Sequence, residues 1–390
     1  MPDCLAKFDD LLEVRPPLSQ EQLSLIPAKR GVVALLAEDG KPIVLLTAGD
    51  IRARVRSRLN EADPDLPRRS ADLRRLTRAV QWALASSHFE TDLRFFFLAQ
   101  SMWPDRYASM LAWKPAWFVH VDPGDDYPHF SATRKVWGSP GRYTGPFSAE
   151  RAAQHFIEVI QDGFDLCRDY RCLRRSPNAE RCTYGQMGRC VSPCDGTMPM
   201  SDYRRLMTRA ADFAEGARQD FRREMKDRMK VAADALNYES AAAIKARLER
   251  LGELDGGEFQ HVRPAEQFQF ILVQRGRKRT CAEVFLVDRG RIFRLPPIEY
   301  PPPEQQLQVA LAEMQRLTSE PAHCDNPQRQ LIGLVSHYLF SGEQRRGLIV
   351  RWKAALTAAE LAGCIEEARE TLALRQPPKR PNPRAGKTGP

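Results

Sequence analysis

Five of the nine cysteines in this 390-residue chain are packed into one short stretch. Cys182, Cys190 and Cys194 are separated by seven and by three residues, and Cys167 and Cys172 lie just upstream. Thiolates are good ligands for soft and borderline metals, and four of them satisfy either Zn²⁺ or an iron–sulfur cluster. The pattern predicts one metal centre held by Cys172, Cys182, Cys190 and Cys194, with Cys167 as the alternative to Cys172.

The same stretch is rich in arginine, with Arg168, Arg171, Arg174, Arg175, Arg181 and Arg189. Guanidinium groups at this density would offset the negative charge of a thiolate cluster or contact phosphate groups. A solvated basic loop is the other interpretation. For contact with phosphates, we single out Arg174, Arg175 and Arg189 as DNA-binding candidates.

The overall charge also points to an anionic partner. The chain has 59 Lys plus Arg against 50 Asp plus Glu, a formal net charge of +9, which favours nucleic acid or an acidic protein surface. No stretch approaches ~18 consecutive apolar residues, and the N-terminus lacks the basic-then-apolar order of a signal peptide. An odd number of clustered cysteines suits a reducing compartment. We therefore expect a cytoplasmic protein with no membrane partner.

Several enzyme classes have no support in the sequence. It has no P-loop glycine-lysine motif, no Gly-x-Ser-x-Gly elbow and no His-Glu-x-x-His helix. ATP hydrolysis, acyl transfer and zinc-peptidase chemistry are therefore not indicated.

The elements that must position the cysteines indicate an α+β fold. Upstream, residues 25–111 are predicted to form a small α/β domain, in which the Asp39-Gly40 pair marks a hairpin turn and Asp50 caps a helix. Its expected elements are strands over 31–36 and 42–47 and helices beginning at 51, over 70–86 and over 89–102.

Downstream of this domain, the boundaries follow changes in composition. We expect a linking region over 112–165, the cysteine segment over 166–200, a helical hairpin over 201–255, a C-terminal α/β region over 262–373 and a disordered basic tail over 374–390. The linking region should hold a strand over 117–121 and a helix over 150–162. The C-terminal region should hold strands over 268–273, 281–287 and 291–295, a sheet that prolines end after 295, and helices over 304–318, 327–340 and 357–373.

The expected hairpin is almost continuously helical from 202 to 254 and turns at 237–240. Its arms carry matching apolar seams, Met225, Met229, Ala232 and Leu236 on one and Ala241, Ile244, Leu248 and Leu251 on the other. An isolated two-helix hairpin buries little surface, so such a unit suits docking onto a second protein.

The run from Gln186 to Gly196 resembles the Gln-hydrophobic-Gly-Arg-Cys-x-x-Pro-Cys-x-Gly signature of the UvrC family, one of the three components of the bacterial UvrABC excision nuclease. Residues 126–130 and 141–147 resemble two further family motifs, and the similarity extends over about residues 25–300. The resemblance implies nucleotide excision repair and a 4Fe-4S cluster, with Zn²⁺ as the alternative. Beyond residue 300 the chain is shorter than the family's second nuclease domain and DNA-binding modules require, which implies a truncated form.

Residues 236–248 resemble the UVR motif that the UvrC family shares with UvrB. They keep the aromatic residue, the glutamate and the Ala-Ala pair, whereas Lys245 and Ala246 stand where the family usually has Arg-Asp. The resemblance implies UvrB as a partner. It points to Leu236, Tyr238, Glu239 and Ile244 as the partner-binding residues.

The N-terminal block resembles the GIY-YIG nuclease domain, but its catalytic residue types are absent. Both tyrosine positions hold valine, Val33 and Val44, and the glutamate position falls on Phe95 or Phe96. A valine cannot transfer a proton, and a phenylalanine cannot bind Mg²⁺. Arg54 matches the arginine that stabilises phosphate charge and is the one catalytic remnant.

Two nearby acids, Glu90 and Asp92, are possible substitutes for the missing metal ligand. Loss of the base and the metal ligand removes contributions of ~10²-fold or more each, so we predict no incision by this domain. Mg²⁺ is expected only if a nuclease activity remains. Arg52 and Arg54 are candidates for phosphate contacts.

Three hypotheses remain open at this point. The first is a non-catalytic UvrC-like protein that binds DNA, UvrB or both. The second is an active DNA endonuclease with substituted catalytic groups. The third is a regulator in which the metal centre senses redox state and controls DNA binding.

Overall fold

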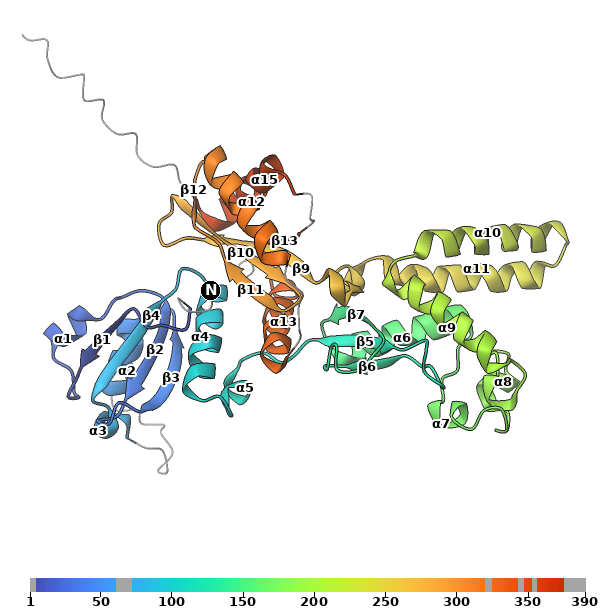
Figure 1. Cartoon of the computed structure of the whole chain (residues 1–390), viewed down its shortest axis with the longest axis horizontal. Helices are drawn as coiled ribbons and strands as arrows, with labels where there is room; N and C mark the ends of the chain where they lie inside the picture. The colour runs from blue at the N-terminus through green and yellow to red at the C-terminus, as the bar shows by residue number, and fades with distance from the viewer. Residues whose placement is uncertain (1–4, 61–71, 320–324, 343–346, 353–355, 375–390) are drawn as a thin grey trace, which may run out of the picture.

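The computed structural model describes residues 5–60, 72–319, 325–342, 347–352 and 356–374. Three antiparallel sheets form three units, and a long helical hairpin projects from one of them (Figure 1). Sheets and helices follow one another in blocks rather than in strict alternation, so the predicted α+β class is confirmed.

The N-terminal unit is a four-stranded sheet in the order β1-β4-β2-β3 with a helix on each face. Its elements are β1 (Asp10–Glu13), α1 (Gln20–Leu25), β2 (Gly31–Leu36), β3 (Pro42–Ala48), α2 (Ile51–Leu59), α3 (Leu73–Leu76), β4 (Ala79–Leu84), α4 (His88–Met102) and α5 (Tyr107–Met110). The predicted hairpin is β2–β3. The predicted cap is also confirmed, because the Asp50 side chain accepts a hydrogen bond from the Ala53 N–H at 2.9 Å.

The helix predicted over 70–86 is wrong. Within the described residues, only the four-residue α3 is helical there, and Ala79–Leu84 form β4, which pairs with both β1 and β2. Val80, Trp82 and Ala83 are buried against the two faces of the sheet, so strand pairing and burial on both sides override the local helical pattern.

The middle unit is a sheet in the order β6-β5-β7-β8, covered by the long helix α6. Its elements are β5 (Trp117–Val121), β6 (Ser131–Thr133), β7 (Arg142–Phe147), α6 (Glu150–Phe164) and the short strand β8 (Arg263–Pro264). The cysteine segment follows α6 and contains α7 (Tyr170–Leu173), α8 (Thr183–Gln186) and the 3-10 turn η1 (Pro193–Asp195). Helix α9 (Met200–Glu215) returns the chain to the middle unit, where Tyr203 and Met207 are fully buried.

The predicted helical stretch over 202–254 is interrupted twice. Gly216 ends α9 with a positive φ, and Leu236, also at a positive φ, ends α10 (Arg218–Asp234) before Asn237 caps α11 (Tyr238–Gly252). Helices α10 and α11 form the predicted hairpin, which extends away from the three sheets (Figure 1). Two 3-10 turns, η2 (Glu253–Asp255) and η3 (Gly257–Phe259), lead back from it.

The C-terminal unit is built on the strand order β11-β10-β9-β13, with β12 also paired to β10. Its elements are the 3-10 turn η4 (Ala265–Gln267), β9 (Gln269–Arg275), β10 (Cys281–Asp288), β11 (Arg291–Arg294), β12 (Ile298–Glu299), α12 (Glu304–Thr318), α13 (Asn326–Leu339), β13 (Leu348–Arg351) and α15 (Ala358–Leu372). The three predicted strands and three predicted helices are confirmed. The expectation that prolines end the sheet is wrong, because β12 and β13 extend it beyond Pro297.

One hydrophobic core joins the N-terminal and C-terminal units. The ring of Phe89 on α4 packs edge-on against Phe285 of β10 at 5.2 Å and against Tyr338 of α13 at 5.3 Å. The Trp113 indole donates a hydrogen bond to the Gln330 carbonyl at 2.8 Å. The two ends of the described chain therefore fold against one another, as Figure 1 shows.

Among the described residues, no helix is both long enough and apolar enough to span a membrane. The disordered tail predicted over 374–390 lies outside the described residues except for Leu374, which is buried in the core of the C-terminal unit.

Candidate functional site

The five clustered cysteines lie in the loops between α6 and α9. Helix α6 ends where Asp165 adopts a left-handed conformation, with φ 51°, and this turn sends the chain into the cysteine segment. Cys172 lies on α7, Cys182 starts α8 and Cys194 lies in η1, while Cys167 and Cys190 are in the connecting loops. All five are free thiols; Cys167, Cys190 and Cys194 are buried, and Cys172 and Cys182 are half-buried.

The thiols are close enough to perturb one another. A hydrogen bond from Cys167 lowers the pKa of Cys190 to about 7, and the same contact raises the pKa of Cys167. Burial raises the pKa of Cys194, and the charges of Cys182, Cys190 and Cys172 raise it further. The charges of the other three predicted ligands therefore all act on the Cys194 thiol.

Two groups in the segment donate hydrogen bonds to sulfur. The Ser192 N–H donates to Cys190 Sγ at 3.4 Å, and the Arg175 guanidinium donates to Cys172 Sγ at 3.8 Å. Hydrogen-bond donors and cations around sulfur favour the thiolate, which is the form that ligates a metal.

The cysteine sulfurs have the chemistry that a thiolate-ligated metal requires, but their positions in this structure do not form a metal site. Among the described residues, no three or more His, Cys, Asp or Glu side chains stand in positions that could hold an ion together. Four soft sulfur donors in a cationic loop suit an iron–sulfur cluster or Zn²⁺, provided that the half-buried Cys172 and Cys182 move toward the buried thiols. Cys167, already hydrogen-bonded to Cys190, stays the alternative to Cys172.

The predicted DNA-binding arginines of this segment are all exposed. Arg174 lies over the Tyr170 ring at 5.9 Å, and Arg189 pairs with Asp162 of α6 at 3.4 Å. Sequence reasoning missed Tyr170 and a second exposed tyrosine, Tyr184, which stacks under Arg168 at 5.1 Å. Their position next to arginines was the available signal, since sites for single-stranded nucleic acid combine positive charge with aromatic rings on which bases stack.

The positions that the resemblance assigns to nuclease catalysis do not meet at one site. Val33 and Val44 point to the face of the N-terminal sheet that α2 covers, where Val33 is fully buried. Phe95 and Phe96 belong to α4, which covers the opposite face. Apolar packing therefore fills both faces where catalytic groups would lie.

The two arginines of α2 differ in their contacts. Arg52 donates from Nε to the Ile26 carbonyl at 2.7 Å and from Nη2 to the Ser24 carbonyl at 3.0 Å, so its guanidinium joins α2 to the end of α1. Arg54 is exposed, and no side-chain partner for it occurs among the described residues. Arg54 is thus the more accessible of the two phosphate-binding candidates.

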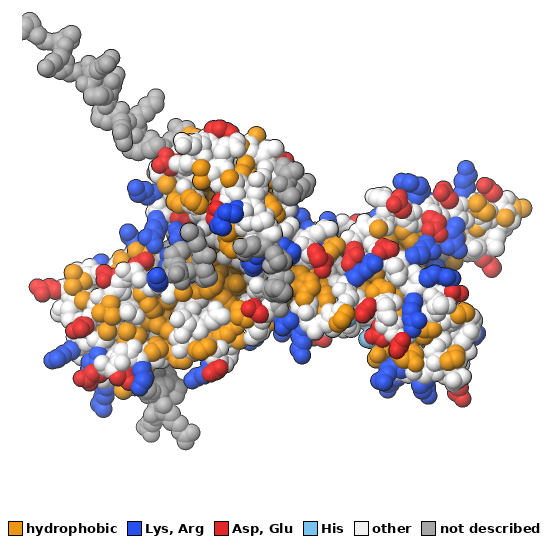
Figure 2. All heavy atoms as spheres, in the orientation of Figure 1, with side chains coloured by type: hydrophobic (Ala, Val, Ile, Leu, Met, Phe, Trp, Pro, Cys, Tyr) orange, Lys and Arg blue, Asp and Glu red, His pale blue; other side chains and the backbone are white. Residues whose placement is uncertain are grey.

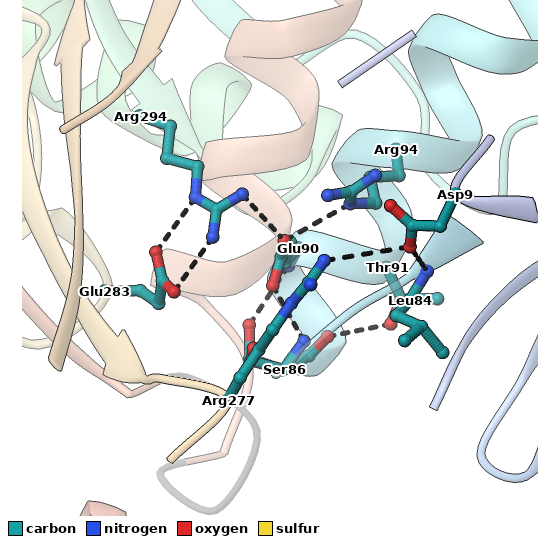
Figure 3. Close-up of polar contacts among 10 residues, drawn as sticks. Asp9, Leu84, Ser86, Glu90, Thr91, Arg94, Arg277, Glu283 and Arg294 are labelled. Carbon is teal, nitrogen blue, oxygen red and sulfur yellow. Dashed lines mark hydrogen bonds and ion pairs between the residues drawn. The ribbon is translucent and has the colours of Figure 1, made fainter. Parts of the chain in front are cut away.

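The proposed substitute acids are already engaged in the junction between units (Figure 3). Glu90 is fully buried on α4, where it accepts from Arg94 Nε at 3.2 Å and from the Ser86 N–H at 2.7 Å, and Arg294 Nη1 lies 3.5 Å away. Arg294 also holds Glu283 through two contacts of 2.9 Å.

The second acid, Asp92, accepts a hydrogen bond from the Tyr338 hydroxyl of α13 at 2.7 Å. Neither substitute acid therefore faces an open site. This pairing argues against the active-nuclease hypothesis.

The base of the α10–α11 hairpin is anchored to α6, and its tip is exposed to solvent. Arg247 pairs with Asp165 at 2.6 Å, and the Leu251 side chain packs into the space left by Gly163. Burial fades outward along the predicted seam, from buried Met225 and Leu251 to half-buried Met229, Ile244 and Leu248.

At the tip of the hairpin, Leu236 is 70% exposed and Tyr238 is 66% exposed. Glu239 is exposed beside them, whereas Ile244 is half-buried within the seam. Hydrophobic atoms are visible at the far end of the hairpin in Figure 2. Three of the four predicted partner-binding residues therefore face solvent.

Comparisons with known proteins show which proteins this chain resembles. Residues 116–213 match the family described as UvrC/Cho excinuclease, middle domain, which covers the middle unit apart from β8, the cysteine segment and most of α9. The UvrABC system protein C of Caldanaerobacter subterraneus subsp. tengcongensis is 25% identical over 276 residues, 70% of this chain and 44% of that relative. The proteins of the same name from Syntrophus aciditrophicus and Leptospira biflexa are 26% and 28% identical over 282 and 243 residues.

These matches cover 70% and 60% of this chain and 44% and 38% of the two relatives. The chain thus spans less than half the length of the curated relatives it matches. No solved structure matches it. Residues 116–213 therefore match a UvrC/Cho excinuclease middle domain, and over most of its length the chain is similar to proteins named UvrABC system protein C.

Proposed function

We propose that this chain acts in nucleotide excision repair as a UvrC-type protein that binds DNA and UvrB without cutting DNA itself. One observation supports the proposal that the chain does not cut DNA. The nuclease positions are occupied by Val33, Val44 and Phe95 or Phe96 on opposite faces of one sheet, within apolar packing. Such positions offer neither a proton acceptor nor a ligand for a divalent cation.

The hairpin tip supports the UvrB part. Leu236 and Tyr238 at the tip are about two-thirds exposed. Among the described residues the hairpin is anchored to α6, α9 and η2, near its base, so these two side chains stay available in the free protein. Leu236 and Tyr238 supply apolar and aromatic contact area of the kind that dominates protein interfaces. Ile244, within the seam, would support the tip rather than touch the partner.

The cysteine segment supports DNA binding and a metal. We propose that Cys172, Cys182, Cys190 and Cys194, with Cys167 as the alternative fourth ligand, hold a 4Fe-4S cluster or Zn²⁺. The ion or cluster would cross-link the loops between α6 and α9 and so fix the exposed arginines around it. Reducing conditions in the cytoplasm, where we place this function, would keep the thiols available.

The decisive experiment for catalysis is incision of damaged duplex DNA with Mg²⁺ or Mn²⁺, by the chain alone and with UvrA and UvrB. We expect no cleavage, while binding to DNA and UvrB is retained. Metal-dependent cleavage that disappears in Arg54→Ala would restore the nuclease hypothesis, with catalytic groups other than those considered above.

Docking is tested separately, by measuring UvrB binding to Leu236→Asp. Position 236 has a positive φ, which aspartate tolerates better than most residues, so the turn should survive the change. The matched control is Leu25→Asp, at a leucine 65% exposed on α1. We expect the first variant to lose UvrB binding and the second to keep it; equal binding by both would remove the docking proposal.

A further inference from the structure

The turn between β9 and β10 carries a cluster of basic side chains to which the proposed function assigns no role. Arg275, Arg277, Lys278 and Arg279 stand within five residues with no acid between them, and all four side chains are exposed. Like charges at this density repel one another, so an anion that binds there gains the attraction of several cations at once. Figure 2 shows Lys and Arg side chains gathered beside the junction of the two units, where Figure 1 places this turn.

The turn is held in shape by its own backbone. The Gly276 N–H donates to the Cys281 carbonyl at 3.0 Å, and the Cys281 N–H donates to the Lys278 carbonyl at 3.1 Å. A Cβ at Gly276 would lie 2.7 Å from the Cys281 oxygen, so only glycine fits there. The cations are therefore presented on a preformed loop, which lowers the entropy cost of binding.

A small recess opens beside the turn, between the N-terminal and C-terminal units. It has a volume of about 210 Å³, and its polar lining includes Arg30, Arg275, Ser86 and Ser87, with no carboxylate among the described residues that line it. The volume is below the roughly 300–1,000 Å³ of sites for drug-sized ligands and suits a single phosphate group better than a whole nucleotide.

One polar atom near the recess has no hydrogen-bond partner among the described residues. The Ser86 hydroxyl oxygen is buried and makes no hydrogen bond within the described part of the chain. A buried hydroxyl without a hydrogen-bond partner destabilises the fold, and a phosphate oxygen would accept a hydrogen bond from it.

The attraction comes from the cations and not from the start of α4. That helix is already capped, since Ser87 Oγ accepts from the Glu90 N–H at 3.1 Å and Glu90 Oε2 accepts from the Ser86 N–H at 2.7 Å. Arg277 is tied to Asp9, 3.7 Å away, across the junction (Figure 3).

The other cations of the region are uncompensated. Within the described ranges, Arg30, Arg275, Lys278 and Arg279 form no ion pair, so the region keeps a surplus of positive charge. This surplus is available to an anion.

We infer that the β9–β10 turn and the adjacent recess bind the phosphodiester backbone of DNA. One phosphate enters the recess between Arg30 and Arg275, and its neighbours along the strand lie on Lys278 and Arg279. This inference rests on the proposed DNA-binding function and gives it a contact surface separate from the arginines of the cysteine segment.

The test measures how DNA binding by the full chain depends on salt. Each phosphate that a cation neutralises contributes about 0.9 to the slope of log K against log salt concentration for duplex DNA. The triple variant Arg275→Gln/Lys278→Gln/Arg279→Gln should therefore lower the magnitude of the slope by about 2–3, measured by fluorescence anisotropy of a labelled duplex. Arg30→Gln should lower it by about 1. Lys41→Gln, in the β2–β3 turn and paired with Asp39, is the matched control and should leave the slope unchanged.

The outcomes separate this inference from the proposed function. A wild-type chain that binds no DNA would remove both. DNA binding with a normal slope in the triple variant, but a reduced one in Arg174→Gln/Arg175→Gln, would remove only the inference, because the cysteine segment would then carry the backbone contacts.

A second measurement distinguishes the source of the phosphate. Calorimetry with inorganic phosphate on the wild-type chain reports whether the recess takes the free ion. Binding of the ion together with an unchanged slope in the triple variant would make the recess a free-phosphate site and overturn the assignment to DNA. A reduced slope supports the assignment whether or not the free ion binds.

Discussion

The substitution Glu90→Gln should destabilise the junction between the N-terminal and C-terminal units strongly. Glu90 is fully buried and lies 3.2 Å from Arg94 Nε and 3.5 Å from Arg294 Nη1. At an effective dielectric constant of about 20, each contact supplies about 5 kcal/mol of Coulomb attraction, part of which offsets the cost of taking the charges out of water. Glutamine keeps the shape but leaves both guanidinium groups without this anion, and removal of one partner from a buried cluster costs about 3–5 kcal/mol.

A urea titration followed by far-UV circular dichroism measures this loss. With a slope of about 2 kcal/mol per molar urea, a loss of about 4 kcal/mol lowers the unfolding midpoint by about 2 M. The matched control is Asp39→Asn, whose carboxylate lies only 2.7 Å from Lys41 but is exposed, and which should leave the midpoint where it is. If Glu90→Gln unfolds at the wild-type midpoint, burial of this network does not stabilise the junction and the reasoning is refuted.

Three further predictions concern the middle of the chain. Hydrogen bonds from Thr197 and from Arg181 lower the pKa of Asp195 from 3.8 to about 2. The stabilising contribution of this carboxylate is therefore complete above about pH 4 and is lost as the pH falls toward 2. Arg181→Gln should shift acid unfolding, followed by near-ultraviolet circular dichroism, to higher pH. Gly163→Ala should lower the free energy of unfolding in urea by about 1–3 kcal/mol, because its Cβ would overlap a leucine of α11, whereas Gly252→Ala, with open space around it, should not. Anaerobically purified protein should contain roughly four iron atoms per chain by elemental analysis, and Cys194→Ser should lose most of them; an iron-free wild type that holds zinc would select the alternative metal.

Local signals in the sequence predicted most of the regular structure. The Asp39-Gly40 pair marks the β2–β3 turn, where Gly40 has a φ of 74°, and Asp50 caps α2 as its position before an apolar periodicity suggests. These signals succeed because turn and cap energies depend on a few neighbouring residues. The hairpin α10–α11 was predicted from the matching apolar seams of its two arms, which are also a local pattern.

The errors lie where distant pairing decides the structure. Ala79–Leu84 become a strand only because β1 and β2 lie on either side of them, and Leu348–Arg351 become β13 only by pairing with β9. The candidate site also combines features that a local pattern predicts with features that depend on distant residues. The thiols are identifiable from their spacing, whereas the partners of Glu90 include an arginine some 200 residues away, which no local pattern reveals.

The core shared by the two ends of the described chain has a consequence for synthesis. Phe89 packs against Phe285 of β10, roughly 200 residues further along the chain, and a ribosome that adds about 5–20 residues per second needs about 10–40 s to make that length. Throughout that interval the face of α4 that carries Phe89 has emerged but lacks the sheet that covers it. The nascent N-terminal unit therefore passes through a long period with an exposed aromatic surface, and a chaperone that binds such surfaces should associate with the chain until β9 and β10 emerge.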